Sequence, residues 1–318
     1  MVKTILAFLL LTSSVLAQVT IFPGNNPLDT DLGTLFRTSV AAPTADMKVI
    51  TLGPGVYDLG SFPAFVQGEN LLIRGSGRDQ TFLVGHGEGH SAWACAIECR
   101  GRFITFEDLT LKSDVSMGGQ SCVIGYASNA TESGARLVIR RCRIKGRMFG
   151  VYSWKHPGHY IHIEDSEIVA GCFPIAAAVS NGPSGQYLTI RNCVIRGYGE
   201  LREPEEYVPT PTGQDETYST VYGIYARGGT INVFDTYFDM QGSPKKHAVV
   251  GIGVPTKAAA STIINVYNCS FSIRQNGALR VADIEIQNPG INPIVIGGTG
   301  HTGGEVEVVY PTEEHIEQ

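Results

Sequence analysis

A short pattern of apolar and polar positions recurs along the chain. Two apolar residues flank one variable residue, and a third apolar residue follows five positions after the second. A looser form begins at Leu71/Ile73, and the complete pattern occurs at Ile104/Phe106/Leu111, Leu137/Ile139/Ile144, Ile161/Ile163/Ile168, Leu188/Ile190/Ile195, Ile231/Val233/Phe238 and Ile264/Val266/Phe271. Its alternation with a period of two predicts short β-strands. Successive starts lie 33, 33, 24, 27, 43 and 33 residues apart, which indicates a repeat protein.

Each repeat changes direction at a pair of residues before its third apolar position. The pairs are Asp108-Leu109, Arg141-Cys142, Asp165-Ser166, Asn192-Cys193, Asp235-Thr236 and Asn268-Cys269. Asp or Asn stands first in five of the six pairs, and both residues tolerate the left-handed backbone that a sharp turn needs. Stacked at the strand spacing of ~4.8 Å, these residues should form a ladder along one edge of the fold.

A further strand is predicted after most repeats, at 122–126, 149–153, 175–180, 221–226 and 249–254. A leucine-rich repeat would have tighter, fixed intervals, and a propeller would repeat four strands at about 40 residues. The shortest intervals fit one turn of three strands, and the longer ones fit a turn with an inserted loop. We therefore predict an all-β fold, a right-handed parallel β-helix of about 8–9 rungs.

No domain boundary interrupts the repeats, because the Pro- and Gly-rich runs fall between strands. We predict one domain over 18–318, with an N-terminal cap at 18–48, rungs at 49–296 and a C-terminal cap or tail at 297–318. Residues 1–17, with Lys3, an apolar run at 5–11 and small residues ending at Ala17, are typical of a signal peptide. That run is too short to span a bilayer, so we expect a secreted, extracellular protein without membrane association.

Two segments resemble the first rungs of the pectin-lyase-like superfamily of secreted β-helices. They are VITLGPGVYDL at 49–59 and NLLIRGSG at 70–77. The resemblance extends over most of the predicted mature chain, but only in its architecture. The two motifs specify the geometry of the coil and do not specify a reaction. The reaction motifs of the group are incomplete, because the chain has neither the paired aspartates of polygalacturonases nor the Trp-Ile-Asp-His motif of pectate lyases. The separated aspartates of pectin methylesterases cannot be placed, so the member family stays open.

Charge excludes one class of partner. The formal net charge is −6, whereas a general nucleic-acid binder needs a basic face for phosphate contacts. No His/Cys cluster has the spacing of a zinc site. The sequons at Asn129 and Asn268 are candidate N-glycosylation sites for a secreted protein.

The seven cysteines are too few for a disulfide-stapled mini-protein and fall into groups. Three occupy the inward position of the turn pairs: Cys142, Cys193 and Cys269. In alternate rungs they would lie ~10 Å apart, beyond the reach of a disulfide, so we expect buried thiols. Nearer the N-terminus, the disulfide candidates are Cys95 with Cys122 or Cys99.

Charged residues form two outward columns. One alternates in sign along Glu107, Arg140, Glu164 and Arg191, and we interpret it as a structural ion ladder. The other column is cationic and consists of Lys112, Lys145 and Arg196, with Arg143 and Arg147 close by. The long insertion 197–220 brings Tyr198 and several acidic residues to the same corner, and His247 lies in a neighbouring loop. This strip can bind an anionic sugar chain, and a solvated charged face is the alternative.

A histidine-rich loop, WKHPGHY, occupies 154–160 at the opposite corner. Trp154 and His159 are candidate substrate contacts, because aromatic rings stack on sugars. His156 is a candidate for proton transfer, because histidine titrates near neutrality. His86 and His90 form a weaker pair, because the surrounding glycines leave the backbone too loose to preorganise a metal, and no metal site is predicted.

The leading hypothesis is a lyase that cleaves an acidic, uronate-containing polysaccharide by β-elimination. In this reaction a cation neutralises the uronate carboxylate, and a base removes the acidified neighbouring proton. The substrate-binding candidates are Lys112, Lys145, Arg147, Arg196, Trp154 and His159, and the catalytic candidates are Tyr198, His247 and His156. The alternative is a non-catalytic β-helix, such as a glycan-binding adhesin or a cell-wall component. Calcium is the one cofactor considered, for a lyase only, and we expect a monomer whose partner is a polysaccharide or glycan.

Overall fold

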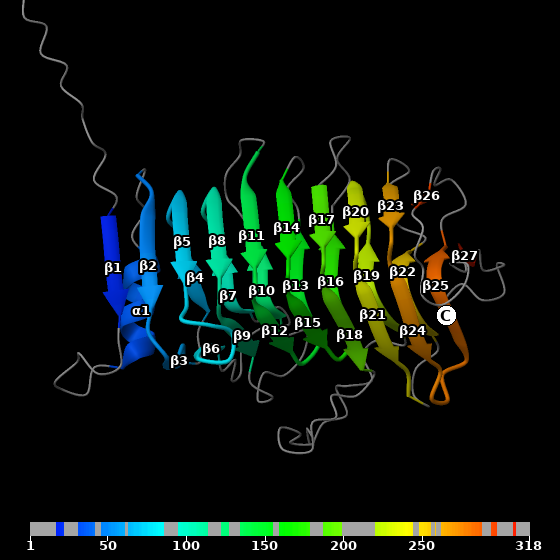
Figure 1. Ribbon diagram of the computed structural model, residues 1–318, viewed down its shortest axis with the longest axis horizontal. Coiled ribbons are helices and arrows are strands. Elements are labelled where there is room, and N and C mark those ends of the chain that lie inside the picture. The colour runs from blue at the N-terminus through cyan, green and yellow to red at the C-terminus, as the bar shows by residue number, and fades with distance from the viewer. Residues whose placement is uncertain are drawn as a thin grey trace, which may run out of the picture.

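The computed structural model describes residues 17–21, 31–41, 46–60, 63–85, 95–113, 122–126, 134–154, 159–178, 187–198, 220–243, 248–255, 258, 262–287, 294–297 and 308–309. Within these ranges the chain forms three parallel β-sheets and one helix, α1 (Leu32–Ala41). Figure 1 shows the strands side by side along one long axis, as in a parallel β-helix. The predicted all-β coil is confirmed.

The three sheets are named A, B and C in the order in which the chain passes through them. Sheet A consists of β1 (Ala17–Ile21), β2 (Lys48–Leu52), β5 (Asn70–Arg74), β8 (Phe103–Glu107), β11 (Arg136–Arg140), β14 (Tyr160–Glu164), β17 (Tyr187–Arg191), β20 (Thr230–Phe234), β23 (Ile263–Tyr267) and β26 (Ile294–Gly297). Sheet B consists of β3 (Gly55–Asp58), β6 (Thr81–Gly85), β9 (Thr110–Ser113), β12 (Arg143–Gly146), β15 (Glu167–Ala170), β18 (Val194–Tyr198), β21 (Tyr237–Gln241) and β24 (Ser270–Arg274). Sheet C consists of β4 (Ala64–Val66), β7 (Cys95–Cys99), β10 (Cys122–Tyr126), β13 (Phe149–Trp154), β16 (Phe173–Ala178), β19 (Thr220–Ala226), β22 (Ala248–Val254), β25 (Arg280–Ile286) and β27 (Val308–Val309).

One turn of the coil runs through sheets A, B and C and returns to A one strand further along. Each sequence repeat supplies its first two apolar residues to sheet A and its third to sheet B, as Ile163 in β14 and Ile168 in β15 illustrate. The further strands predicted after the repeats lie in sheet C. In the part of the chain that the structure describes, no helix has the length and hydropathy needed to cross a membrane.

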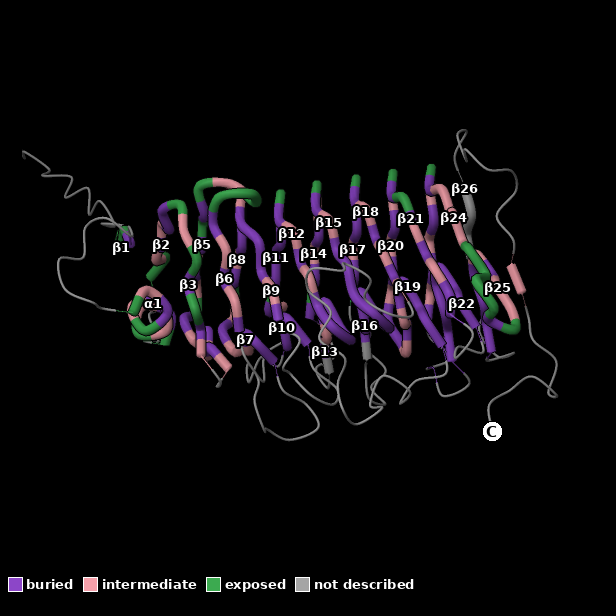
Figure 2. The backbone as a smooth tube through the Cα atoms, turned by 90° about the horizontal axis from the view of Figure 1, so that it is seen from below, coloured by how far each residue is buried: buried purple, intermediate pink, exposed green. Residues whose placement is uncertain are grey.

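A continuous hydrophobic core fills the inside of the coil. Equivalent residues stack directly, as Ile139, Ile163 and Ile190 do in register along sheet A, and all three are fully buried. Figure 2 shows this buried interior in purple along the stacked strands. Helix α1 adds Phe36 and Val40 to the same core. Burial of each large apolar side chain stabilises the fold by about 1.5–3 kcal/mol. The predicted caps at 18–48 and 297–318 stay predictions.

The turn from sheet A to sheet B repeats with the same backbone in six rungs. The first residue of each predicted turn pair has a positive φ between 49° and 56°. Side chains also pair along this column: Arg141 Nε donates to Asp108 Oδ1 at 2.7 Å, and Asn192 Nδ2 donates to Asp165 Oδ1 at 2.6 Å. Asn268 repeats the second arrangement with Asp235. The predicted ladder is confirmed, and a carboxylate alternates with a donor from rung to rung.

Replacing Asn192 with alanine is expected to destabilise the protein. Its φ of +49° is a conformation that costs an ordinary residue roughly 1–2 kcal/mol, and the hydrogen bond to Asp165 is also lost. Asn192→Gly should recover most of this loss, because glycine adopts a positive φ freely. Urea denaturation of both variants measures the difference. Equal losses for alanine and glycine would contradict a backbone origin.

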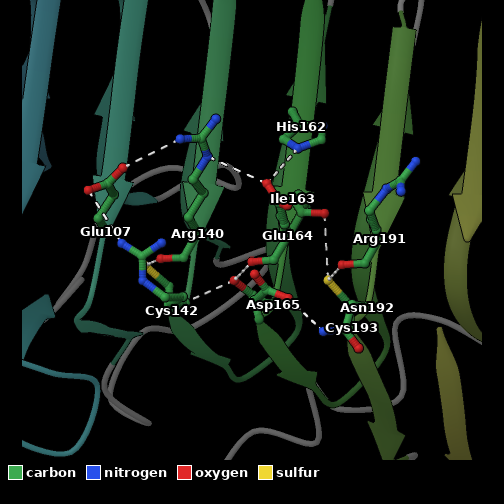
Figure 3. A network of polar contacts seen from close by, with 12 residues as sticks. Glu107, Arg140, Cys142, His162, Ile163, Glu164, Asp165, Arg191, Asn192 and Cys193 are labelled. Carbon is green, nitrogen blue, oxygen red and sulfur yellow. Dashed lines mark hydrogen bonds and ion pairs between the residues drawn. The ribbon is translucent and has the colours of Figure 1, made fainter. Parts of the chain in front are cut away.

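The second residue of each turn pair is buried, and after Leu109 in the first pair these residues form a column of small polar groups. Cys142, Cys193 and Cys269 are buried thiols whose Sγ atoms lie 3.1–3.3 Å from the carbonyl oxygen two residues earlier. Ser166 and Thr236 occupy the same position and donate to the equivalent carbonyl at 2.7 and 2.8 Å. Figure 3 shows Cys142 and Cys193 in alternate turns, with the turn of Asp165 between them. The prediction of buried, unbridged thiols at these positions is confirmed.

Burial makes the stability of this column sensitive to alkaline pH. Desolvation raises the pKa of Cys142 from its ordinary value of 9.0 to about 12. Below pH 9 the thiol is protonated in both states, whereas between pH 9 and 12 only the unfolded thiol ionises. The free energy of unfolding therefore falls by about 1.4 kcal/mol per pH unit through this group as pH rises.

Cys142→Ser is expected to remove that contribution while keeping the hydrogen bond to the Arg140 carbonyl, as Ser166 does in the next rung. Denaturation of the variant and the parent at pH 8 and pH 10.5 checks this. Between those two pH values the variant should lose roughly 2 kcal/mol less stability than the parent. An identical pH dependence would refute the assignment to this thiol.

The outward column of alternating charges is an ion ladder, as predicted. The Arg140 guanidinium lies 3.7 Å from the Glu107 carboxylate and 3.6 Å from that of Glu164 (Figure 3). The end of the column differs from the prediction, because Arg191 stacks over the Phe234 ring, 4.9 Å from its centroid. Partly exposed pairs of this kind contribute at most about 1 kcal/mol each, in keeping with a structural role.

Candidate functional site

Sheet C is the sheet that the long connections border on both sides. The turn from A to B takes two residues in the six repeats, whereas the connections from B to C include 86–94, 114–121 and 199–219. Those from C back to A include 127–135, 155–159 and 179–186. Binding residues gather where variable connections join a rigid scaffold. The outer face of sheet C is therefore the candidate functional site.

Aromatic side chains occupy the middle of this face in two columns. Phe149, Phe173 and Tyr222 succeed one another from β13 to β16 to β19, and all three are buried. Tyr152 and Tyr225 stand in the neighbouring column and are half-buried, with Ala176 between them. We call these five aromatic residues the aromatic face.

The rings of the aromatic face contact one another. Phe149 meets Tyr152 edge-on with centroids 5.2 Å apart, and Phe173 lies 5.3 Å from Tyr225. Phe173 and Tyr222 stack at 5.7 Å. Such pairs stabilise a surface by about 0.5–1.5 kcal/mol beyond area burial. The three buried rings therefore hold Tyr152 and Tyr225 in place.

A guanidinium lies beside the aromatic face. Arg227 follows the last residue of β19, and its charge lowers the pKa of the Tyr152 phenol, although burial has the larger, opposite effect and raises that pKa to about 12. Arg227 Nε is buried and lacks a hydrogen-bond partner within the described ranges. A guanidinium next to phenols can take up a carboxylate in bidentate geometry.

A buried polar network closes the C-terminal side of the aromatic face. Glu285 in β25 is fully buried, and both of its oxygens accept hydrogen bonds from Arg280 at 2.7 Å. Gln287 Nε2 donates to Glu285 at 2.7 Å and lies 3.2 Å from the Tyr222 hydroxyl. The Tyr222 ring reaches this network across Gly253, where an added Cβ would lie 1.9 Å from the ring. Gly253 is therefore required for the position of Tyr222.

The other side of the face carries a second Arg–Glu pair. Arg100 Nε donates to Glu98 at 2.7 Å and its guanidinium stacks over Phe65, 4.1 Å from the centroid. Glu98 in β7 and Glu285 in β25 are separated by six strand spacings, which is about 29 Å. A pair of carboxylates that cleaves glycosides must lie within about 5–9.5 Å. These two carboxylates cannot act together.

The predicted cationic strip lies on sheet B instead. Lys112, Lys145 and Arg196 share one outward column, with Val169 between the second and third. The Glu167 carboxylate, one column away, lies 2.6 Å from Arg196. These positions extend along β9, β12, β15 and β18.

The structure corrects the prediction that this strip is cationic. Arg196 also lies 3.5 Å from Asp239, so carboxylates flank its guanidinium on both sides. Glu167 pairs in addition with Arg143 at 2.7 Å, and Asp239 pairs with Arg274. The strip is an ion-pair network, and its geometry does not support Arg196 as a binding group for a uronate. Glu167 is a diagonal neighbour of Arg196, which sequence spacing missed, whereas Asp239 is the direct partner of Arg196 in the ladder between β18 and β21 and continues the same outward column.

Two more sequence candidates on sheet B are disfavoured by burial. Arg147 is only 8% exposed, which leaves little guanidinium surface for a polymer. Burial raises the pKa of Tyr198 above its ordinary value, so this phenol stays protonated near neutral pH and is unsuited to act as a base. Lys112 and Lys145 are half-buried, and their binding role stays a prediction.

The structure describes only part of the histidine-rich loop. His159 is 2% exposed and its ring lies 5.6 Å from that of Tyr126 in the interior. The burial of His159 just before β14 disfavours a contact with substrate, and that contact stays a prediction. Trp154 ends β13, but its side chain, like all of His156, lies outside the described part of the chain.

His247, His86, His90 and the sequon at Asn129 also lie outside the described residues. Asn268 is exposed in the turn between β23 and β24, and its glycosylation stays a prediction. Among the residues that the structure describes, no three His, Cys, Asp or Glu side chains gather where they could hold a metal ion.

Sequence reasoning missed the aromatic face because sheet C departs from strict alternation. The ladder between β13 and β16 pairs Phe149 with Phe173 and then Val151 with Ile175, so Gly150 and Pro174 are skipped. Phe149 and Tyr152 are three residues apart, yet their rings meet on one face. The one available signal was the pair of motifs FxxY at 149–152 and YxxY at 222–225.

Neither a protein-family model nor a curated protein sequence matches the chain. Solved structures do match. A pectin methylesterase, PemA from Erwinia chrysanthemi, aligns with a TM-score of 0.57 and 12% identity over 94% of this chain and 93% of its own. YbhC of Escherichia coli aligns with a TM-score of 0.55 and 10% identity over 91% and 86%. A pectin methylesterase in complex with a hexasaccharide aligns at 0.54 and 11% over 94% and 93%. Likeness at this identity shows the fold.

Proposed function

We propose that this chain, which has the right-handed parallel β-helix fold of the pectin-lyase-like proteins, binds an acidic, uronate-containing polysaccharide on the outer face of sheet C. The observation that carries the proposal is the position of Arg227 beside Tyr152 and Tyr225. Phenol rings offer an apolar face and a hydroxyl to a sugar, and a guanidinium recognises a carboxylate. The face thus combines the two groups that a uronate requires.

The spacing of the two tyrosines fits a polymer that runs along the coil. Tyr152 and Tyr225 are two strand spacings apart, or about 9.6 Å at their Cα atoms. Ala176 lies between them on the intervening strand, and its side chain is too small to project as far as the two phenol rings. Sugar rings of an extended chain can therefore meet one phenol after another while Arg227 binds a carboxylate.

The fold neighbours support this class of ligand. Three of these structures are of pectin methylesterases, and two of the three hold a hexasaccharide. Ester hydrolysis is not the reaction that we propose, because Glu98 and Glu285, the carboxylates on the two sides of the aromatic face, are about 29 Å apart and each is held by an arginine.

β-Elimination is the second candidate, favoured by the same Arg227. A guanidinium bound to the uronate carboxylate would withdraw charge from it and acidify the neighbouring proton, which a base must then remove. His156 and His247 remain the proposed bases, because both stand in connections that border sheet C. Secretion, inferred from residues 1–17, would place such activity outside the cell.

Incubation of the full-length protein with polygalacturonate, methyl-esterified pectin and a neutral β-glucan tests both parts of the proposal. Binding to the first two and not to the third supports recognition of uronates. Ultraviolet absorbance from an unsaturated product, with calcium or with a chelator, would establish elimination. Binding with no new absorbance would leave a glycan-binding protein without this reaction. Equal binding to the neutral glucan would overturn the proposed ligand class.

A further inference from the structure

We infer that Cys95 and Cys122 form a disulfide bond when the chain folds under oxidising conditions. The two residues belong to neighbouring strands of sheet C, β7 and β10, and they are direct partners in the parallel register. The structure holds them as thiols. The inference rests on their geometry and is independent of the proposed ligand.

The Cα spacing of the two cysteines is within the range of a disulfide, and a small approach of the two side chains would close the bond. Direct partners on neighbouring parallel strands have Cα atoms ~4.8 Å apart, within the range of about 4.4–6.8 Å that disulfides span. A hydrogen bond joins the two thiols, so the side chains already face each other. Both are 3% exposed and belong to the cluster that contains Phe149.

The other nearby cysteines do not compete. Cys99 is four residues further along β7, ~13 Å from Cys95 in an extended strand, and its side chain belongs to the interior core. Cys172 immediately precedes β16, two strands beyond β10, or ~10 Å from Cys122. The structure thus selects Cys122 over Cys99 as the partner of Cys95.

The oxidant is a small disulfide such as oxidised glutathione. The Cys95 thiolate attacks one of its sulfurs, forms a mixed disulfide and releases one glutathione. The Cys122 thiolate then attacks Cys95 Sγ and releases the second glutathione. The two cysteines lose two protons and two electrons, and the oxidant gains them. Desolvation raises the thiol pKa of Cys122, so this exchange should occur before β7 and β10 are packed.

The bond would fasten two rungs beside the aromatic face. Residues 114–121 connect sheet B to β10 just before Cys122, and 86–94 connect it to β7 just before Cys95. A covalent link at the first residue of both strands therefore joins two long connections at their ends on sheet C. Its removal should lower the melting temperature by roughly 5 °C, because the unfolded chain gains freedom.

Differential alkylation of the full-length protein tests the inference. The protein is exported from a host through an oxidising secretory route, unfolded in the presence of one alkylating reagent, reduced, and treated with a second reagent of different mass. Peptide mass spectrometry should find the second label on Cys95 and Cys122 and the first label on the other five cysteines. The first label on both Cys95 and Cys122, or the second label on Cys99, would overturn the inference.

Two variants and one preparation serve as controls. Cys122→Ser should move Cys95 to the first label, whereas Cys99→Ser should leave the pair unchanged. Protein made in a reducing cytosol should carry the first label on all seven cysteines and melt at the lower temperature. Equal melting temperatures for the oxidised and reduced preparations would contradict the claim that the bond fastens the two rungs.

Discussion

Arg227→Ala is expected to weaken binding of polygalacturonate by about 10- to 100-fold, since a hydrogen bond to a charged group is worth about 1.5–3 kcal/mol. Arg227 Nε is buried without a hydrogen-bond partner in the described structure, and the guanidinium is close enough to Tyr152 to lower the pKa of its phenol. A bound carboxylate would pair with the guanidinium through its terminal nitrogens. Titration calorimetry with an oligogalacturonate measures the loss, and Arg227→Lys should recover only part of it because an ammonium lacks the planar fork.

The matched control is Arg196→Ala on sheet B. Arg196 is bound by Glu167 at 2.6 Å and lies 3.5 Å from Asp239, so its removal should change affinity by less than about twofold. Circular dichroism confirms that both variants remain folded. Loss of binding in Arg196→Ala with none in Arg227→Ala would move the site to sheet B and contradict the proposal.

Glu285→Ala is expected to reduce the free energy of unfolding by about 1.5–3 kcal/mol, because it removes the fully buried carboxylate that accepts two hydrogen bonds from Arg280. Glu285 is 0% exposed, whereas the Arg280 side chain that it binds is 23% exposed. The loss also frees Gln287, which otherwise links Glu285 to the Tyr222 hydroxyl. Affinity for polygalacturonate should fall as well, because Tyr222 supports the aromatic face.

Glu285→Gln separates the effect of charge from that of shape. The amide keeps an oxygen that accepts from Arg280, so the variant should lose less stability than Glu285→Ala. Arg280→Ala combined with Glu285→Ala should be less destabilising than the sum of the single changes, because neither charge is then left unpaired. Additive losses in urea denaturation would show that the pair does not act as a unit.

Much of the fold could be predicted because the repeat is carried by local chemistry. The pair of apolar residues around one variable position, as in Ile161 and Ile163, predicts a strand, and Asp or Asn at the turn predicts its end. All six turn residues have the positive φ that this choice implies, and even Arg141 adopts it. The thiols of Cys142 and Cys193 were predicted to be buried for the same reason.

The candidate site could not be predicted in the same way, because it depends on register between rungs. The charge of Arg196 is compensated by Glu167 and Asp239, which are 29 and 43 residues away along the chain. The aromatic face depends on a skipped position in β13 and β16, so a search for residues with a period of two does not find it. His159 was assigned to a loop, but its place at the start of a rung directs it into the core.

The most direct test of the central claim is hydroxyl-radical footprinting of the tyrosines with and without a saturating oligogalacturonate. If the ligand lies on the outer face of sheet C, Tyr152 and Tyr225 should be oxidised more slowly in its presence, while the exposed Tyr187 and Tyr237 on sheets A and B are unchanged. Protection of Tyr198 and Tyr237 with no change at Tyr152 and Tyr225 would place the ligand on sheet B and contradict the account.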